Sequence, residues 1–151
     1  MNISNPNISF LQNNEIFVFG SNEAGIHGAG AARAAYDKFG AVLGQGYGFA
    51  GSSFAIPTKD KNIETLPISK IKIYVDKFLI YAAEHTELEF LVTKIGTGLE
   101  GLSVEEIAPL FEEAIHAKNI YLPREFHDFL NLSQPLSRFD YYSCDALAES
   151  K

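Results

Sequence analysis

Lys59 and Glu100 are the two ionisable side chains of this sequence whose surroundings favour chemistry. Each follows a short apolar run, so both are expected at strand ends that face one cleft. A partly desolvated lysine can lose its proton and attack a sugar aldehyde carbon, and a carboxylate beside it can act as a general acid or base. The simpler interpretation is that Lys59 ends a strand in solvent and that Glu100 is a surface loop charge. Without further information from the rest of the sequence, the simpler interpretation is favoured.

Two glycine loops accompany these side chains, and each leads from a predicted strand into a predicted helix. The loops span residues 20–30 and 94–102. Glycine lets backbone approach a ligand closely, and a helix N-terminus offers unpaired N–H groups and a positive dipole end to an anion. Two such loops could hold two phosphates or a pyrophosphate. The candidate ligand-binding residues in the loops are Ser21, Asn22, His27, Gly28, Ala29, Gly30, Gly96, Thr97, Gly98 and Leu99.

Common nucleotide and metal motifs are absent from the sequence. Arg33 occupies the position of the third glycine of the dinucleotide fingerprint, and no G-x-x-x-x-G-K-[ST] segment occurs. There is no H-E-x-x-H segment and no paired His and Cys set, and the single cysteine is Cys144. The sequence therefore predicts neither a metal nor a cofactor. The first loop could equally be a plain connection, in which His27 covers a helix end and does not donate to a phosphate.

The charge and hydropathy of the chain restrict its partners. The 151 residues carry a formal net charge of −7, whereas a general nucleic-acid-binding surface needs clustered Lys and Arg. No apolar run approaches the length of a membrane span, and residues 1–10 lack the basic and long apolar regions of a signal peptide. We expect a cytoplasmic, soluble protein with no membrane partner and no general nucleic-acid binding. A local contact with one modified nucleotide stays open.

Apolar periodicity predicts alternating strands and helices in a single domain over residues 1–151. An apolar face at helical spacing runs from about Pro67 to His85, and Ser103 with Glu106 forms a capping box that opens a helix to about Lys118. The other predicted elements are helices at 29–39 and near 125–130, and strands at 8–10, 15–19, 53–56, 89–93 and 119–122.

Right-handed crossovers between these elements predict an α/β fold, with a largely parallel sheet of about four to six strands and helices on both faces. The core spans about residues 15–123, and residues 124–151 form a tail. Pro57 is expected to stop a strand, and the glycine-rich segment 40–51 is expected to be a flexible surface loop or a loop folded over a ligand. In such sheets ligands bind at the carboxyl ends of the strands, where both glycine loops and Lys59 are expected.

Three short segments follow one another along the chain: GAGAA at 28–32, PTK at 57–59 and KIGTGLE at 94–100. Together they resemble the macrodomains, a family that binds ADP-ribose, and most closely the branch with the terminal ADP-ribose glycohydrolase and the antitoxin that removes ADP-ribose from DNA. In that branch a G-A-G-[IA]-A segment opens a helix that ends in K-F-G, as Lys38-Phe39-Gly40 does here. A strand ending in I-T-K carries the catalytic lysine, and R-I-G-C-G-L-D carries the catalytic aspartate. The resemblance covers about residues 16–122.

The resemblance implies a three-layer α/β/α macrodomain-like fold with a mostly parallel mixed central sheet. It implies that Glu100 helps to break the bond at the distal ribose carbon of an ADP-ribosyl group. Lys59 would attack that carbon and form a transient Schiff-base-type adduct. The diphosphate would lie across both glycine loops, and Asn22 would reach the distal ribose.

Two features depart from the family pattern. Glu100 replaces aspartate, so its carboxylate lies one methylene further out, and such a displacement can cost a large rate factor. The family's early G-D-[LI] segment, which recognises adenine, has no counterpart in residues 1–14. Phe126 is a candidate for stacking on the base instead.

The sequence thus predicts an ADP-ribose-binding macrodomain with ADP-ribosyl hydrolase activity on a modified protein or nucleic-acid base, with Lys59 and Glu100 as its catalytic residues. The alternative is a non-catalytic reader or sequestering protein for ADP-ribose-type nucleotides, including cyclic signalling forms. A third interpretation is a macrodomain-like fold that serves only assembly.

Overall fold

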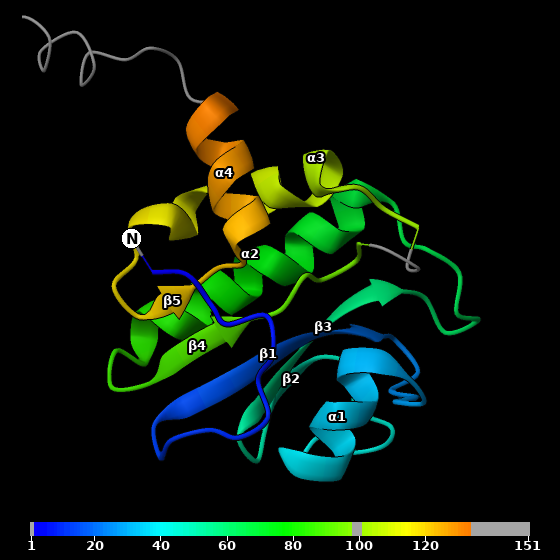
Figure 1. Ribbon diagram of the computed structural model, residues 1–151. Helices are drawn as coiled ribbons and strands as arrows, with labels where there is room; N and C mark the ends of the chain where they lie inside the picture. The colour runs from blue at the N-terminus through cyan, green and yellow to red at the C-terminus, as the bar shows by residue number, and fades with distance from the viewer. Residues whose placement is uncertain (1, 98–100, 134–151) are drawn as a thin grey trace, which may run out of the picture.

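A five-stranded mixed sheet forms the centre of the protein in the computed structural model, which describes residues 2–97 and 101–133 (Figure 1). The spatial order of the strands is β2-β3-β1-β4-β5. Their bounds are Glu15–Asn22 for β1, Gly48–Ala50 for β2, Ser53–Lys59 for β3, Glu89–Val92 for β4 and Ile120–Tyr121 for β5. All neighbouring pairs are parallel except β2 with β3. The predicted α/β class and mostly parallel mixed sheet are confirmed.

Helices cover both faces of this sheet. Helix α1 (Gly30–Lys38) lies on one face, and α2 (Ile68–Glu84), α3 (Val104–Ile107) and α4 (Arg124–Ser133) lie on the other (Figure 1). Two apolar clusters result, a small one between α1 and β1 and a large one beneath α2. The apolar face predicted for α2 is confirmed, since its buried residues are Ile71, Val75, Phe78 and Ala82.

Strand β1 is longer than the sequence predicts. Its apolar residues Ile16–Phe19 are at most 4% exposed, as expected for a central strand that is buried on both faces. The strand then continues through Gly20 and Ser21 to Asn22, because β3 continues alongside it. After an irregularity between Ser21 and Asn22, Asn22 pairs with Lys59. The expected break at residue 20 is therefore wrong.

Pro57 does not stop β3, contrary to the prediction. Strand β2 pairs only with residues 53–55, so Pro57 lies beyond the end of that neighbour. A proline lacks an N–H group and is tolerated in a strand where no ladder bond is needed. Strand β3 thus carries Lys59 to the rim of the sheet.

The glycine-rich segment 40–51 packs against the first glycine loop and contains the unpredicted strand β2. A Cβ atom added to Gly25 would lie 2.4 Å from the Gln45 nitrogen, and one added to Gly46 would lie 2.3 Å from the Asn22 oxygen. Real Cβ atoms do not come this close to backbone, so both positions need glycine. In the structure, the segment expected to be a flexible surface loop or a loop folded over a ligand thus contains a short strand and makes a backbone-to-backbone contact.

Three predictions in the remaining chain are corrected. No strand forms at 8–10, because the N-terminal segment bridges to the end of β5 at Ile3 and Leu122. The capping box of Ser103 and Glu106 is confirmed, but the helix it opens continues as a 3-10 helix, η2 (Ala108–His116), with a kink at Phe111. Phe126 is fully buried with its ring 5.7 Å from that of Phe111, so it cannot stack on a base.

Within residues 2–97 and 101–133, no helix is long and apolar enough to cross a membrane.

Candidate functional site

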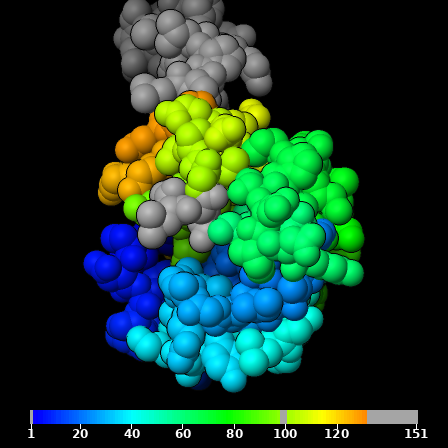
Figure 2. Space-filling view, turned by 90° about the vertical axis from the view of Figure 1, so that its right-hand side faces the viewer, coloured from blue at the N-terminus to red at the C-terminus, as the bar shows by residue number. Residues whose placement is uncertain are grey.

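The carboxyl ends of β1, β3 and β4 meet at one edge of the sheet, where a pocket of about 510 Å³ opens. Figure 2 looks onto this edge, where the blue segment after β1, the green segment after β3 and the yellow-green segment that leads into α3 come together. The lining residues are Gly20, Ser21, Asn22, Ile26, Gly28, Ala29, Gly30, Ala31, Ala32, Lys59, Ile63, Thr93, Lys94, Ile95, Gly96 and Thr97. Most of the predicted site residues in the described part of the chain are therefore brought together.

The start of α1 forms one wall of this pocket. The N-cap residue Ala29 is extended and makes no side-chain cap, and the first turn contains no acidic residue. The first N–H groups of the helix therefore have no side-chain partner within the described residues. A Cβ atom added to Gly28 or Gly30 would meet nothing within 4 Å, so the backbone there faces open space. This wall has the properties of an anion site.

Lys59 lines the same pocket at the end of β3, half-buried, and its backbone is fixed from two sides. The Lys59 carbonyl accepts a 2.9 Å hydrogen bond from the Glu23 N–H, and Lys59 forms a bridge with Thr65. A cation is thus held at the rim of the same pocket as the N-terminus of α1. The two features together favour a ligand with phosphate groups.

Glu23, the residue after β1, ties this strand end to α2. The Tyr74 hydroxyl donates a 2.5 Å hydrogen bond to Glu23 Oε2, and Lys70 Nζ lies 3.3 Å from the same oxygen. The hydrogen bond from Tyr74, with help from Lys70, holds the pKa of the Glu23 carboxyl below its ordinary value. Burial and the bond to Glu23 raise the pKa of Tyr74 to about 12. The contacts of Glu23 with Tyr74 and Lys70 thus attach the end of β1, which lines the pocket, to α2.

Asn22 lines the pocket, but its side chain is engaged in the loop. Its Nδ2 donates to the Ile26 carbonyl at 2.7 Å, and its Oδ1 accepts from the Ile26 N–H at 2.9 Å. The amide thus positions Ile26, a residue that the sequence analysis did not select. The neighbouring Ser21 is buried, lines the pocket and donates to the Asn22 carbonyl.

Among the predicted site residues that the structure describes, His27 is the one outside the pocket lining. Its ring is 2% exposed, lies edge-on to Phe19 and places Nε2 3.0 Å from the Val42 carbonyl oxygen. The side chain therefore joins the first glycine loop to the segment after α1. This geometry fits a structural role for His27 and not donation to a phosphate in the pocket.

The second glycine loop contributes Gly96 and Thr97 to the pocket, whereas Gly98, Leu99 and Glu100 lie outside the described residues. The N-terminus of α3 differs from that of α1. The Ser103 hydroxyl accepts from the Glu106 N–H at 3.2 Å, and the Glu106 carboxylate accepts from the Ser103 N–H at 2.9 Å. This helix end is thus partly satisfied by its own side chains, and Ser103 is not part of the pocket lining.

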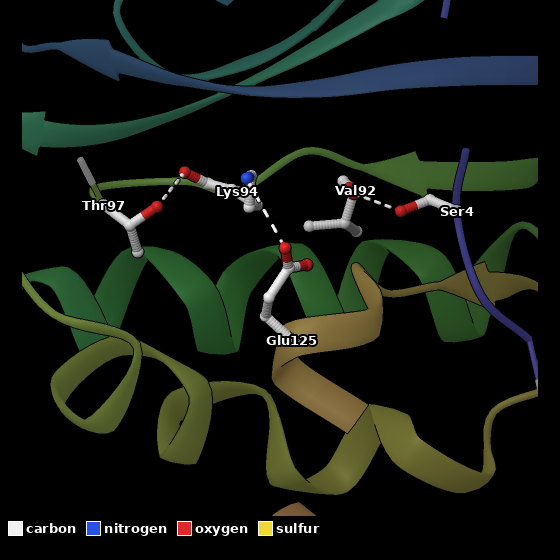
Figure 3. Close-up of polar contacts among 5 residues, drawn as sticks. All are labelled: Ser4, Val92, Lys94, Thr97 and Glu125. Carbon is white, nitrogen blue, oxygen red and sulfur yellow. Dashed lines mark hydrogen bonds and ion pairs between the residues drawn. The ribbon is translucent and has the colours of Figure 1, made fainter. Parts of the chain in front are cut away.

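A second cavity, of about 630 Å³, adjoins the first and shares Thr93 and Lys94 with it. It lies between the N-terminal segment, the end of β4 and the start of α4, and its lining also includes Ser4, Arg124 and Glu125. Figure 3 shows how this boundary is held: Lys94 Nζ lies 3.5 Å from Glu125 Oε2, and the Ser4 hydroxyl donates to the Val92 carbonyl at 2.8 Å. The sequence does not predict this cavity, because only tertiary contacts bring its three segments together.

No group of three or more His, Cys, Asp or Glu side chains that could hold a metal ion occurs in the described segments 2–97 and 101–133.

Comparison with protein-family models, with curated proteins and with solved structures gives no match to this chain. The assignment of a function therefore depends on the geometry of the pocket and on the sequence segments that line it.

Proposed function

We propose that this pocket binds ADP-ribose and that the chain is a macrodomain-like ADP-ribosyl hydrolase. One observation carries the proposal: a single pocket joins the uncapped N-terminus of α1 to Lys59 at the end of β3. The helix end is suited to a diphosphate, and the lysine is suited to a phosphate or a sugar carbon. The pocket volume of about 510 Å³ is in the range of small-molecule sites.

The arrangement of helices supports a three-layer macrodomain-like architecture. Helix α1 lies on one face of the mostly parallel sheet and α2 to α4 on the other, and the pocket lies at the carboxyl ends of the central strands. The segments that resemble the macrodomains, at 28–32, 57–59 and 94–97, all contribute to the pocket lining.

The second cavity provides room for the adenosine end of the ligand. ADP-ribose is an elongated molecule in which a diphosphate joins two bulky ends. The linings of the two cavities share Thr93 and Lys94, and we infer that the ligand extends from Lys59 past Lys94 towards Glu125. In this pose the distal ribose lies beside Lys59 and the adenine lies near the N-terminal segment.

The proposed reaction breaks the bond between the distal ribose carbon and the group that carries it. The Lys59 nitrogen forms a bond to this carbon, while the leaving group departs with a proton from the acid, for which Glu100 is the candidate by sequence resemblance. Water then adds to the Schiff-base-type adduct, which releases ADP-ribose and returns the lysine to its amine form.

A second candidate is a protein that binds ADP-ribose-type nucleotides without turnover. The engagement of Asn22 favours this candidate, because the amide expected to reach the distal ribose holds the Ile26 backbone instead. Both candidates use the same pocket and differ only in chemistry.

Calorimetry with free ADP-ribose, followed by turnover assays on ADP-ribosylated glutamate and ADP-ribosylated thymidine, separates the candidates. The hydrolase binds ADP-ribose and releases it from at least one substrate. Binding without release from either substrate supports the second candidate. Absence of ADP-ribose binding contradicts both.

A further inference from the structure

Two exposed isoleucines line the same pocket as Lys59. Ile26 follows β1 with 55% of its surface exposed, and Ile63 follows β3 with 43% exposed. The other large apolar side chains that are described as exposed, such as Ile73 and Ile80 on α2, are not part of this lining. The rest of the lining consists mainly of backbone, small residues and polar side chains. Ile95 also belongs to the lining but is only 2% exposed, so among the described lining residues Ile26 and Ile63 are the large apolar side chains that are exposed.

Each isoleucine is held by a polar residue at the end of a strand. Asn22 fixes Ile26 through the two amide hydrogen bonds of 2.7 and 2.9 Å. Asp60 closes the turn around Ile63, because its Oδ1 accepts from the N–H groups of Asn62 and Glu64 at 2.8 and 3.0 Å. Loop hydrogen bonds thus hold the backbone at or beside both isoleucines.

The backbone of Ile63 is strained. Its φ is 63°, and it is the one non-glycine residue with a positive φ in segments 2–97 and 101–133. A β-branched residue is a poor choice there, since glycine or asparagine adopts this conformation at lower cost. Strain of this kind is concentrated at ligand sites. A strained residue whose side chain lies exposed on a pocket indicates that the side chain itself serves the ligand.

The phosphates and ribose hydroxyls of ADP-ribose gain nothing from two isoleucines, whereas a ring joined to the distal ribose does. The groups attached to this carbon in ADP-ribosyl compounds include carboxylates, amides and the ring nitrogens of heteroaromatic bases. Of these, an uncharged ring buries the most apolar surface against aliphatic side chains.

We propose that Ile26 and Ile63 form an apolar subsite for a flat, uncharged heteroaromatic ring carried on the distal ribose carbon of the ligand. This inference rests on the proposed function, because the ribose must lie beside Lys59 for the ring to reach the two side chains. It assigns the substrate to the ribosylated bases and away from ribosylated carboxylates.

The test compares two probes, ADP-ribose and NADH, by calorimetry. NADH carries an uncharged dihydronicotinamide ring on the carbon where ADP-ribose has a hydroxyl group. We expect the wild-type protein to bind NADH about tenfold more tightly than ADP-ribose, which corresponds to roughly 1.4 kcal/mol. In Ile26→Ser and Ile63→Gly the ratio of the two dissociation constants should fall to near one.

Matched variants separate this effect from changes in stability and surface hydropathy. Ile73→Ser and Ile80→Ser remove isoleucines of similar exposure, 53% and 58%, and should keep the wild-type ratio. Ile63→Gly should melt at the wild-type temperature or above it, because glycine relieves the strained φ.

The outcomes distinguish the two proposals. If the wild type binds ADP-ribose but shows no preference for NADH, or if the preference survives in both pocket variants, the subsite is contradicted and the proposed function stands. If the wild type binds neither probe, the proposed function and the subsite are both contradicted.

Discussion

Lys59 is the residue on which the proposed chemistry depends. A lysine that only attracts phosphate can be replaced by arginine at small cost, whereas a lysine that attacks a carbon must lose its proton, which arginine cannot do. The fixed backbone of Lys59, bonded to Glu23 and bridged to Thr65, allows this substitution to test the side chain without moving the strand.

We predict that Lys59→Arg keeps the affinity for ADP-ribose within about tenfold, roughly 1.4 kcal/mol, and abolishes the release of ADP-ribose from substrate. Borohydride added during turnover should link ADP-ribose to the wild-type protein at Lys59. The exposed neighbour Lys61 supplies the control, since Lys61→Arg should leave both properties unchanged. Full turnover in Lys59→Arg would remove this lysine from the mechanism.

Glu23 gives a prediction on stability and pH. Glu23→Gln should lower the free energy of unfolding at neutral pH by about 1 to 2 kcal/mol, because it weakens hydrogen bonds to a charged group. The folded-state pKa of Glu23 lies below its ordinary value of 4.5, so its contribution is present above 4.5 and is lost as the pH falls through the folded value. The deficit of the variant should therefore shrink at about pH 3.

Urea unfolding at the two pH values measures this deficit. The exposed pair of Lys72 and Asp76 is the control, and Asp76→Asn should change the stability little at either pH. The opposite trend belongs to Tyr74, whose contribution is present below its ordinary pKa of 10.0 and is lost as the pH rises through about 12. An equal deficit for Glu23→Gln at both acid and neutral pH would contradict the role of the carboxylate.

At the scale of elements, the first glycine loop, residues 20–30, packs closely against the glycine-rich segment 40–51. Gly46 has no left-handed backbone, so its requirement for glycine is steric: a Cβ atom would lie 2.3 Å from the Asn22 oxygen. Gly28, also without a left-handed backbone, faces open space. The two positions therefore form a matched pair for the same substitution.

We predict that Gly46→Ala lowers the free energy of unfolding by about 1 to 3 kcal/mol, as overpacking does, and that Gly28→Ala leaves it unchanged within about 0.5 kcal/mol. Denaturant unfolding of both variants measures the difference. Equal stability of the two variants would show that the loops can separate without cost.

Elements that depend on residues close together in the sequence were predicted well. Elements that depend on pairing between distant strands were not. The face of α2 and the capping box of Ser103 with Glu106 depend on residues three and four apart, so the sequence contains the whole signal. The length of β1 depends on β3, which pairs with it as far as Lys59. Pro57 can lie within β3 because β2 pairs only with residues 53–55. Both the length of β1 and the place of Pro57 therefore depend on a neighbouring strand and cannot be read from the adjacent sequence.

The site shows the same division. The sequence placed the strand ends and the start of α1 at one pocket, because the carboxyl ends of parallel strands share an edge. It left two interpretations of His27 open and missed Ile26 and Ile63, since the direction of a loop side chain depends on contacts within the fold. The two Asx residues, Asn22 and Asp60, were the available signal, because such side chains often bond to nearby backbone in turns.

At the scale of the molecule, the two cavities share Thr93 and Lys94 in their linings. The side chain of Lys94 is paired with Glu125 across this boundary, so a ligand that spans both cavities competes with a carboxylate for the lysine. The net charge of −7 adds no general attraction for a diphosphate, so the local cations decide the affinity.

We predict that Glu125→Gln tightens the binding of ADP-ribose about threefold at low salt, because the pair is exposed and weak and its loss frees Lys94. The gain should decrease as salt is added. Asp76→Asn breaks a similar exposed pair, whose residues belong to neither cavity lining, and its titration should show no gain. Weaker binding in Glu125→Gln would contradict a ligand path past Lys94.

The central claim is that ADP-ribose occupies the pocket between the start of α1 and Lys59, and titration of Gly28→Val with ADP-ribose tests it most directly. Valine at position 28 extends into the pocket and meets no protein atom within 4 Å of its Cβ, so the fold should be kept while the diphosphate is blocked. We predict that affinity falls by about a hundredfold, roughly 2.7 kcal/mol, whereas Ala83→Val on the exposed side of α2 binds as the wild type does. Equal affinity in Gly28→Val and the wild type, or no binding by the wild type, would contradict the claim.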